Sequence, residues 1–273
     1  MFQLNIKRTR TRTALGMFEL TYQIAVRSIR KSQSNAIVGL AMNIFQTVLL
    51  IAVFYFMMTF MGMRSNAVRG DFVLYLMSGI FLYMTHSKAM GAVMGAESST
   101  SAMMKHAPMN TIVSILGSAL GSLYLQMLSL VVVLYVYHTV WGPIYIEDPF
   151  GALGMLMLSW ASGVAIGTCF LGLRPWAPEF ATVAQTIYSR VNMIASGKMF
   201  LANTLPPRMR SFFDWNPLFH TIDQARGDIF LNYEPRYSSI SYPICVTLVF
   251  LILGLMAEFY TRQYASASWS ARK

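Results

Sequence analysis

Asp214-Trp215-Asn216-Pro217-Leu218-Phe219-His220 lies in a stretch, residues 203–239, that is neither a clean membrane span nor an ordinary loop. A bilayer crossing needs about 20 mostly apolar residues, and Pro206, Pro207, Pro217 and several charges interrupt this stretch. Its aromatic content is nevertheless too high for a solvent loop. Non-helical backbone at membrane depth is tolerated only where protein or a water-filled cavity surrounds it. The stretch therefore predicts a polytopic membrane protein with a gate or a passage.

The composition of the whole chain agrees with a membrane protein. Hydrophobic residues make up 55% and charged residues 12% of the 273 residues, whereas soluble domains have about 25% charged residues. Cys169 and Cys245 lie in apolar segments, which predicts buried thiols and neither a disulfide nor a metal pair. The histidines are scattered, so no metal site is expected. The net charge of +10 is attributed to membrane topology, and no nucleic-acid partner is expected.

The apolar segments and the breaks between them predict the fold class. Six segments are long enough to cross a bilayer, at about residues 36–63, 72–95, 111–140, 150–173, 180–201 and 240–260. No internal repeat or low-complexity linker is present, so residues 1–273 are read as one transmembrane domain. The expected fold is an all-α polytopic membrane protein. Its parts are a cytoplasmic amphipathic start (1–35), five spans (36–202), an outer re-entrant gate segment (203–239), and a last span with a cytoplasmic tail (240–273).

An amphipathic helix is predicted before the first span. Apolar residues follow 3-4-3-4 spacing at Leu15, Phe18, Tyr22, Ala25 and Ile29, which places them on one helical face suited to the membrane interface. The helix is either a lipid anchor or a lever against a cytoplasmic partner.

The distribution of basic residues predicts the orientation. Seven Lys and Arg residues precede the first span, and the tail ends in Arg272 and Lys273. Cytoplasmic segments carry an excess of such residues. Both termini and the loop 96–110 are therefore expected in the cytoplasm, and the stretch 203–239 on the outer side. No signal-peptide pattern follows Met1, so no cleaved signal is expected.

Three cations lie within predicted spans. Arg190 and Lys198 are eight residues apart in the fifth span, which on one helix separates them by about 12 Å along the axis. Lys88 lies in the inner part of the second span. A charge in hydrocarbon is costly and usually marks a transport pathway. The alternative is a snorkelling side chain or a structural bond to a carbonyl.

The second span also shows an aromatic stripe. Phe72, Tyr75, Gly79, Tyr83 and His86 share one helical face, and aromatic rings can stack on sugars, whereas ordinary packing or lipid contact is the alternative reading. The candidate translocation residues are those in this stripe and the intramembrane cations: Tyr75, Tyr83, Lys88, Arg190 and Lys198.

The loop 96–110 is a candidate for contact with a cytoplasmic partner. Ser and Thr residues at 98–101 could cap a short helix, and the two adjacent methionines are adaptable apolar contacts. An ordinary solvated turn is the alternative. The candidate coupling residues are Glu97, Met103, Met104, Lys105, His106 and Pro108.

The energy source is expected to lie outside this chain. The Gly197-Lys198 pair is followed by Met199, and Asn192 stands where a phosphate-binding loop needs a glycine. The spans are nearly free of Asp and Glu, which ion-driven carriers place at mid-membrane. The chain is therefore not expected to be an enzyme, and a separate ATPase subunit is expected to supply energy.

The order of these features, and several short motifs, resemble the membrane subunits of ABC-2 type exporters. The most specific motifs are Ser196-Gly197-Lys198-Met199-Phe200, Leu205-Pro206-Pro207, Trp215-Asn216-Pro217-Leu218-Phe219-His220 with Arg226, and Tyr75-Leu76-Met77-Ser78-Gly79-Ile80. They are similar to the permease family that exports capsular polysaccharide or lipopolysaccharide O-antigen. Lys198 departs from the pattern, since many members have an apolar residue there.

The resemblance implies a homodimer that works with two copies of a separate ATP-binding subunit in the bacterial inner membrane. That subunit would bind ATP and Mg²⁺, so no cofactor is expected in this chain. The substrate would be a lipid-linked polysaccharide, and an export partner in the periplasm or outer membrane is left open. The loop 96–110 would contact the ATPase subunit and transmit its conformational change to the membrane helices. The outer gate would be formed by Trp215, Asn216, Pro217, Phe219, His220 and Arg226.

Two other functions are weighed against polysaccharide export. One is an ABC-2 exporter subunit for a lipid or a drug. The other is an intramembrane glycosyl- or acyltransferase, which usually needs clustered His, Asp or Glu. His220, Asp214 and Asp223 are the one such cluster in the sequence, and Asn216-Pro217 beside it suggests a turn more than a catalytic site.

Overall fold

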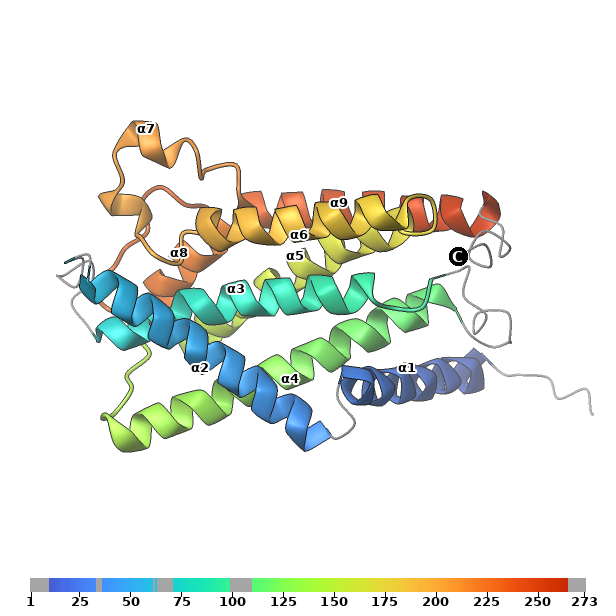
Figure 1. Ribbon diagram of the computed structural model, residues 1–273, viewed down its shortest axis with the longest axis horizontal. Coiled ribbons are helices and arrows are strands. Elements are labelled where there is room, and N and C mark those ends of the chain that lie inside the picture. The colour runs from blue at the N-terminus through green and yellow to red at the C-terminus, as the bar shows by residue number, and fades with distance from the viewer. Residues whose placement is uncertain (1–9, 33–35, 61, 63–70, 99–109, 265–273) are drawn as a thin grey trace, which may run out of the picture.

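The computed structural model describes residues 10–32, 36–60, 62, 71–98 and 110–264, and all regular structure within them is helical. The long helices run along one bundle, with α7 and α8 at one end and the close of α9 at the other (Figure 1). The elements are α1 (Arg10–Ser32), α2 (Ala36–Phe60), α3 (Phe72–Met94), α4 (Thr111–Val140), α5 (Pro149–Leu173), α6 (Pro178–Ala195), the 3₁₀ turn η2 (Ala202–Thr204), α7 (Pro207–Arg210), α8 (Pro217–Ile229) and α9 (Ser241–Tyr264).

Polar side chains define where four of these helices begin. Asp71, Asn110, Asp148 and Asn216 each accept a hydrogen bond from a backbone N–H in the first turn of α3, α4, α5 and α8 respectively. Such capping satisfies donors that the helix itself leaves unpaired. Proline occupies the first turn of α5, α6 and α8, where its missing N–H is tolerated.

Four helices are long and apolar enough to cross a membrane. They are Ile37–Phe60, Thr111–Val140, Pro149–Leu173 and Ser241–Tyr264, so the predicted multi-span helical class is confirmed. The other two predicted spans correspond to α3 and α6, which do not meet this criterion. Most of α3 is buried inside the bundle, where it can carry polar residues. Helix α6 has 18 residues, which is long enough for a span, but Glu179, Arg190 and its other polar residues lower its hydropathy.

The predicted end of the fifth span is wrong. Helix α6 ends at Ala195, six residues before the predicted boundary at Leu201. Gly197 has φ 73°, a left-handed conformation that terminates helices. Lys198 therefore does not continue the helix that bears Arg190, and the spacing expected between these two cations along one axis does not apply.

The centre of the bundle is α3, which packs against α5, and α5 packs in turn against α9. Glycines allow the close approach of α3 and α5. A Cβ on Gly163 would lie 2.3 Å from the carbonyl oxygen of His86, and one on Gly167 would lie 2.7 Å from that of Met90. The small residues of α5 therefore serve helix packing, as such residues commonly do in membrane bundles.

Helix α1 lies against α4 through a second pair of glycines. A Cβ on Gly117 would meet Ile24 at 2.6 Å, and one on Gly121 would meet the carbonyl oxygen of Ala25 at 3.0 Å. Phe18 and Tyr22 of the predicted apolar stripe stay 76% and 70% exposed. The helix thus contacts the bundle with one face and keeps aromatic side chains on its surface, as an interfacial helix does.

Candidate functional site

The segment after α6 forms a compact polar core around Arg226 of α8. Arg226 is 0% exposed. Its Nη1 donates to the carbonyl oxygens of Gly197 and Phe200 at 2.9 and 2.7 Å, and its Nη2 donates to that of Lys198 at 2.6 Å. Charge-assisted bonds of this kind are the strong ones. A single guanidinium therefore fixes the backbone of residues 197–200 on α8.

Asp223, one helical turn before Arg226, fixes two further parts of the segment. Its Oδ1 accepts from the Ala202 backbone N–H at 3.2 Å and from the Tyr233 hydroxyl at 2.5 Å. Its Oδ2 accepts from the Ser238 hydroxyl at 2.7 Å. The Asp223 carboxylate therefore connects the residues that precede α8 to the residues that follow it.

Asn216 joins the start of α8 to the end of α6. Its Oδ1 caps α8 by accepting from the Leu218 backbone N–H at 3.0 Å. Its Nδ2 donates to Asn192 Oδ1 at 2.7 Å and to the Ala195 carbonyl oxygen at 3.0 Å. Pro217 follows in the first turn. The Asn-Pro motif therefore sets the angle between the outer segment and α6.

His220 is also used structurally. Its Nδ1 accepts from the Ser239 backbone N–H at 3.1 Å, which leaves Nε2 to donate to the Asp214 carbonyl oxygen at 2.8 Å. The ring is therefore the Nε2–H tautomer. Of the groups considered for transferase chemistry, His220 and Asp223 thus contact the backbone and neighbouring hydroxyls, whereas the Asp214 carboxylate lies 3.8 Å from Arg210 Nε.

The aromatic residues of the segment divide into a buried and an exposed set. Phe219 is 1% exposed and lies in a cluster with Phe200 and Phe213, with centroid distances of 6.3 and 6.2 Å. Trp215 is 53% exposed, and its Nε1 donates to the Phe212 carbonyl oxygen at 2.6 Å. Of the expected gate residues, Trp215 alone therefore presents its ring to the surroundings.

The structure brings three of the expected pathway residues together inside the protomer. Lys198 is 1% exposed, and its Nζ lies 3.6 Å from the centroid of Tyr83 and 4.7 Å from that of Phe54. Tyr75 lies beneath Arg226, whose Cζ is 4.2 Å from the Tyr75 ring centroid. Phe54 of α2 and the pairing of Tyr75 with Arg226 were not predicted, because their partners are far away in sequence.

Arg190 lies elsewhere, on the exposed half of α6. Residues four apart share one helical face, so Thr182, Thr186 and Arg190 form a polar strip along this half. An apolar strip runs beside it and consists of Val183, Ile187, Val191 and Ile194, all exposed. This helix therefore presents a polar and an apolar surface side by side.

Lys88 lies apart from both Lys198 and Arg190. Its Nζ donates to Gln46 Oε1 at 2.5 Å and so joins α3 to α2.

The predicted coupling loop begins and ends at the end of the bundle opposite α7 and α8 (Figure 1). The Glu97 backbone N–H donates to Ser114 Oγ at 3.1 Å and joins the close of α3 to the start of α4. Met103, Met104, Lys105, His106 and Pro108 lie outside the described residues.

Comparison with known proteins gives relatives for most of the chain. No protein-family model matches it. The chain is 25% identical over 202 residues to a protein named polysialic acid transport protein KpsM of Escherichia coli, covering 71% of this chain and 75% of the relative. A second Escherichia coli protein of the same name matches with 25% identity over 200 residues and the same coverage. These matches confirm the resemblance, drawn above from the sequence, to the membrane subunits that export polysaccharides.

Proposed function

We propose that this chain is the membrane permease subunit of an ATP-driven exporter that moves a lipid-linked polysaccharide across the bacterial inner membrane. The observation that supports this most is the similarity to two polysialic acid transport proteins over 71% of the chain. The name of these relatives specifies an acidic polysaccharide, and the predicted spans of the present chain carry three cations, Lys88, Arg190 and Lys198. The family resemblance of residues 196–226 points to the same class of substrate.

The passage lies between two copies of the chain in this proposal. The protomer is closely packed around Lys198, which touches the rings of Tyr83 and Phe54 and is 1% exposed. The exposed half of α6 offers what a passage needs, namely a polar strip with Arg190 for the substrate and an apolar strip for lipid or the second copy. An arginine facing hydrocarbon costs roughly 2.5–3.5 kcal/mol on insertion scales. A hydrated passage removes that penalty.

The remaining parts take their roles from the resemblance. With α3 and α6 counted, six helices cross the membrane and both termini are cytoplasmic. The loop 96–110 docks on a separate ATP-binding subunit, two copies of which hydrolyse ATP. Residues 203–239 close the outer end of the passage, and the network around Arg226 and Asp223 makes this gate a rigid unit.

Deletion of the gene in the organism that encodes it tests the function. Surface polysaccharide should be lost, and lipid-linked polysaccharide should accumulate on the cytoplasmic side, because synthesis continues while export stops. Reintroduction of the chain should restore the surface polymer. Unchanged surface polysaccharide in the deletion strain, with other exporters of the class inactivated, would refute the assignment. The purified chain should show no ATPase activity without its partner.

Arg190→Ala tests the passage, with Arg262→Ala as the matched control, because Arg262 is an exposed arginine in the last turn of α9. Arg190→Ala should lower export several-fold with unchanged folded yield, because the side chain is exposed on α6. A cysteine variant, Arg190→Cys, should react with a water-soluble thiol reagent, and more rapidly when Trp215→Ala loosens the gate. A loss of folded protein together with an unreactive cysteine would place the passage away from α6.

A further inference from the structure

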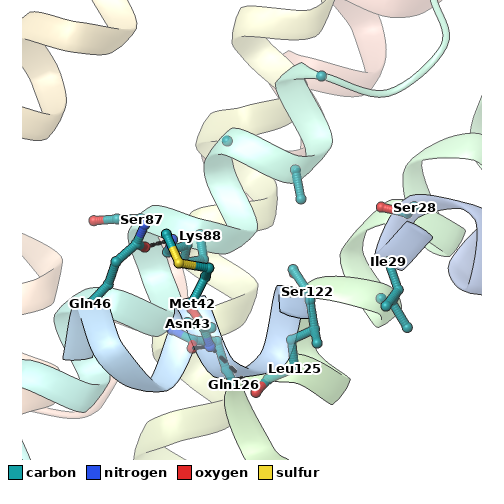
Figure 2. A pocket seen from close by; sticks show the side chains of 15 residues that line it. Ser28, Ile29, Met42, Asn43, Gln46, Ser87, Lys88, Ser122, Leu125 and Gln126 are labelled. Carbon is teal, nitrogen blue, oxygen red and sulfur yellow. Dashed lines mark hydrogen bonds between the residues drawn. The ribbon is translucent and has the colours of Figure 1, made fainter. Parts of the chain in front are cut away.

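A cavity of roughly 390 Å³ lies between α1, α2, α3 and α4, away from the outer segment. Figure 2 shows Lys88 and Gln46 on one side of it and Ser122, Leu125 and Gln126 on the other, with Ser28 and Ile29 of α1 at one end. Its volume lies within the range of small-ligand sites, about 300–1,000 Å³. It is therefore large enough for a lipid headgroup.

The polar lining of this cavity is cationic. Lys88 contributes the charge, and no Asp or Glu is present among the described residues that line it. Its Nζ has one hydrogen-bond acceptor, Gln46 Oε1 at 2.5 Å, although an ammonium group has three donors. A cation inside a membrane protein normally has a partner of opposite charge. An anion in the cavity would supply both the missing charge and the missing acceptors.

A second donor also lacks an acceptor. Asn43 Nδ2 donates to Gln126 Oε1 at 2.6 Å and to Ser129 Oγ at 2.8 Å, which orients the Gln126 amide. Gln126 is 2% exposed, and its Nε2 has no hydrogen-bond partner in the part of the chain that the structure describes. A buried donor without an acceptor is costly. Lys88 and Gln126 therefore present unused N–H groups from different helices to one cavity.

The position of the cavity favours a lipid. Lys88 is six residues before the end of α3, so it lies about 9 Å along the axis from the end of that helix. That end is opposite the outer segment (Figure 1). Ile29, Met42 and Leu125 supply an apolar wall, and Met42 is 43% exposed on the outer surface of α2. Basic pockets between membrane helices on the cytoplasmic side are typical sites for phospholipid headgroups.

We propose that this cavity binds the phosphate group of a membrane phospholipid, with Lys88 as the counter-charge and Gln126 as a neutral donor. The acyl chains lie along the exposed apolar surface of α2, which includes Phe45 and Leu49. Since α1 closes one end of the cavity, the bound lipid ties α1 to α2 and α4. The proposal does not depend on the transported substrate and can be tested by binding alone.

Native mass spectrometry of the detergent-purified full chain measures the binding. The probes are dioctanoyl phosphatidic acid, dioctanoylglycerol as the same lipid without phosphate, and sn-glycerol 3-phosphate as the same headgroup without acyl chains. Phosphatidic acid should bind at low ratios, and the other two should bind much more weakly. Equal binding of glycerol 3-phosphate would overturn the lipid assignment. Equal binding of dioctanoylglycerol would overturn the phosphate assignment.

Three substitutions separate a ligand site from a purely structural lysine. Lys88→Gln should weaken phosphatidic acid binding about tenfold or more, since it removes a charge-assisted bond. Gln46→Glu places a carboxylate beside Lys88, so the structural contact is kept while the anion is repelled. This variant should fold and should lose the lipid as well. Lys88→Arg should retain binding within about threefold, because the charge is kept.

Arg208→Gln is the matched control, since it removes a positive charge from the exposed helix α7 and should leave binding unchanged. The proposal is refuted if phosphatidic acid binds the Gln46→Glu protein as tightly as the unmodified chain. It is equally refuted if Arg208→Gln and Lys88→Gln weaken binding to the same extent, because the effect would then be one of net charge.

Discussion

The outer segment and the cavity between α1 and α4 both place polar residues in an apolar protein, yet they differ in how those residues are bonded. In the outer segment, the two terminal nitrogens of Arg226 reach three carbonyl oxygens, and Asp223 accepts three hydrogen bonds. In the cavity, Lys88 has one acceptor, and Gln126 Nε2 has none among the described residues. Arg226 Nε also has no partner among the described residues, but the carbonyl oxygens and the Asp223 carboxylate are bonded and specify a structure, whereas the cavity leaves donors for a ligand.

The largest expected effect comes from breaking the satisfied network. Arg226→Met leaves three carbonyl oxygens without donors, so the free energy of unfolding should fall by about 3–5 kcal/mol. Lys88→Met removes a cation that has a single acceptor, and it should change stability by less than about 1 kcal/mol. Thermal unfolding of both variants in the same detergent, without added lipid, measures the contrast. Similar losses in the two variants would remove the distinction between the regions.

A backbone position in the outer segment gives the next largest effect. Gly197 has φ 73°, and a Cβ there would lie 2.5 Å from the Phe219 ring. Gly197→Ala should therefore lower stability by about 2–3 kcal/mol through strain and overpacking. Gly154→Ala is the control in α5, where a Cβ meets nothing within 4 Å, and it should stabilise the helix by about 0.5–1 kcal/mol. If Gly197→Ala leaves the stability unchanged, the backbone and the Phe219 ring can adjust to the added methyl group.

Asn216 tests the joint between the outer segment and α6. Asn216→Ala removes a helix cap and two donated bonds, so a loss of about 2 kcal/mol is expected. Asn216→Asp keeps the cap but points a carboxylate at Asn192 Oδ1 and the Ala195 carbonyl. If the joint to α6 matters more than the cap, the aspartate variant should unfold at least as readily as the alanine variant. Full recovery by aspartate would assign the whole effect to capping.

The smallest effect is a pH dependence at the margin of the outer segment. Burial, and then the charge of Asp148, raise the pKa of Asp228 above its ordinary value of 3.8. A raised pKa means that the folded state favours the protonated carboxyl, so this contribution to stability is present at low pH and declines as the pH rises. The unfolding temperature of the unmodified chain should thus fall relative to that of Asp228→Asn between about pH 4 and pH 7. If the unfolding temperatures of the two proteins change in parallel with pH, Asp228 does not make this contribution.

Several parts of the fold were predictable because they depend on local chemistry. The apolar segments at 111–140 and 150–173 coincide with α4 and α5 within one residue at each end. The position of Lys198 was not predictable. Gly197, four residues before the expected boundary at Leu201, ended α6, and only the packing of Tyr83 and Phe54 around the lysine shows where its side chain lies.

The amino-acid sequence by itself determined that this is a helical membrane protein with an interrupted segment at residues 203–239, because hydropathy, proline and glycine act over a few neighbouring residues. It also carried the motifs that relate the chain to polysaccharide exporters. The tertiary structure alone decided that Arg226 holds residues 197–200 and that Lys88, Gln46 and Gln126 line one cavity. The hydrogen bonds of Arg226 and Lys88 join residues between 26 and 42 positions apart, and no local pattern records which distant side chains a fold brings within hydrogen-bond distance.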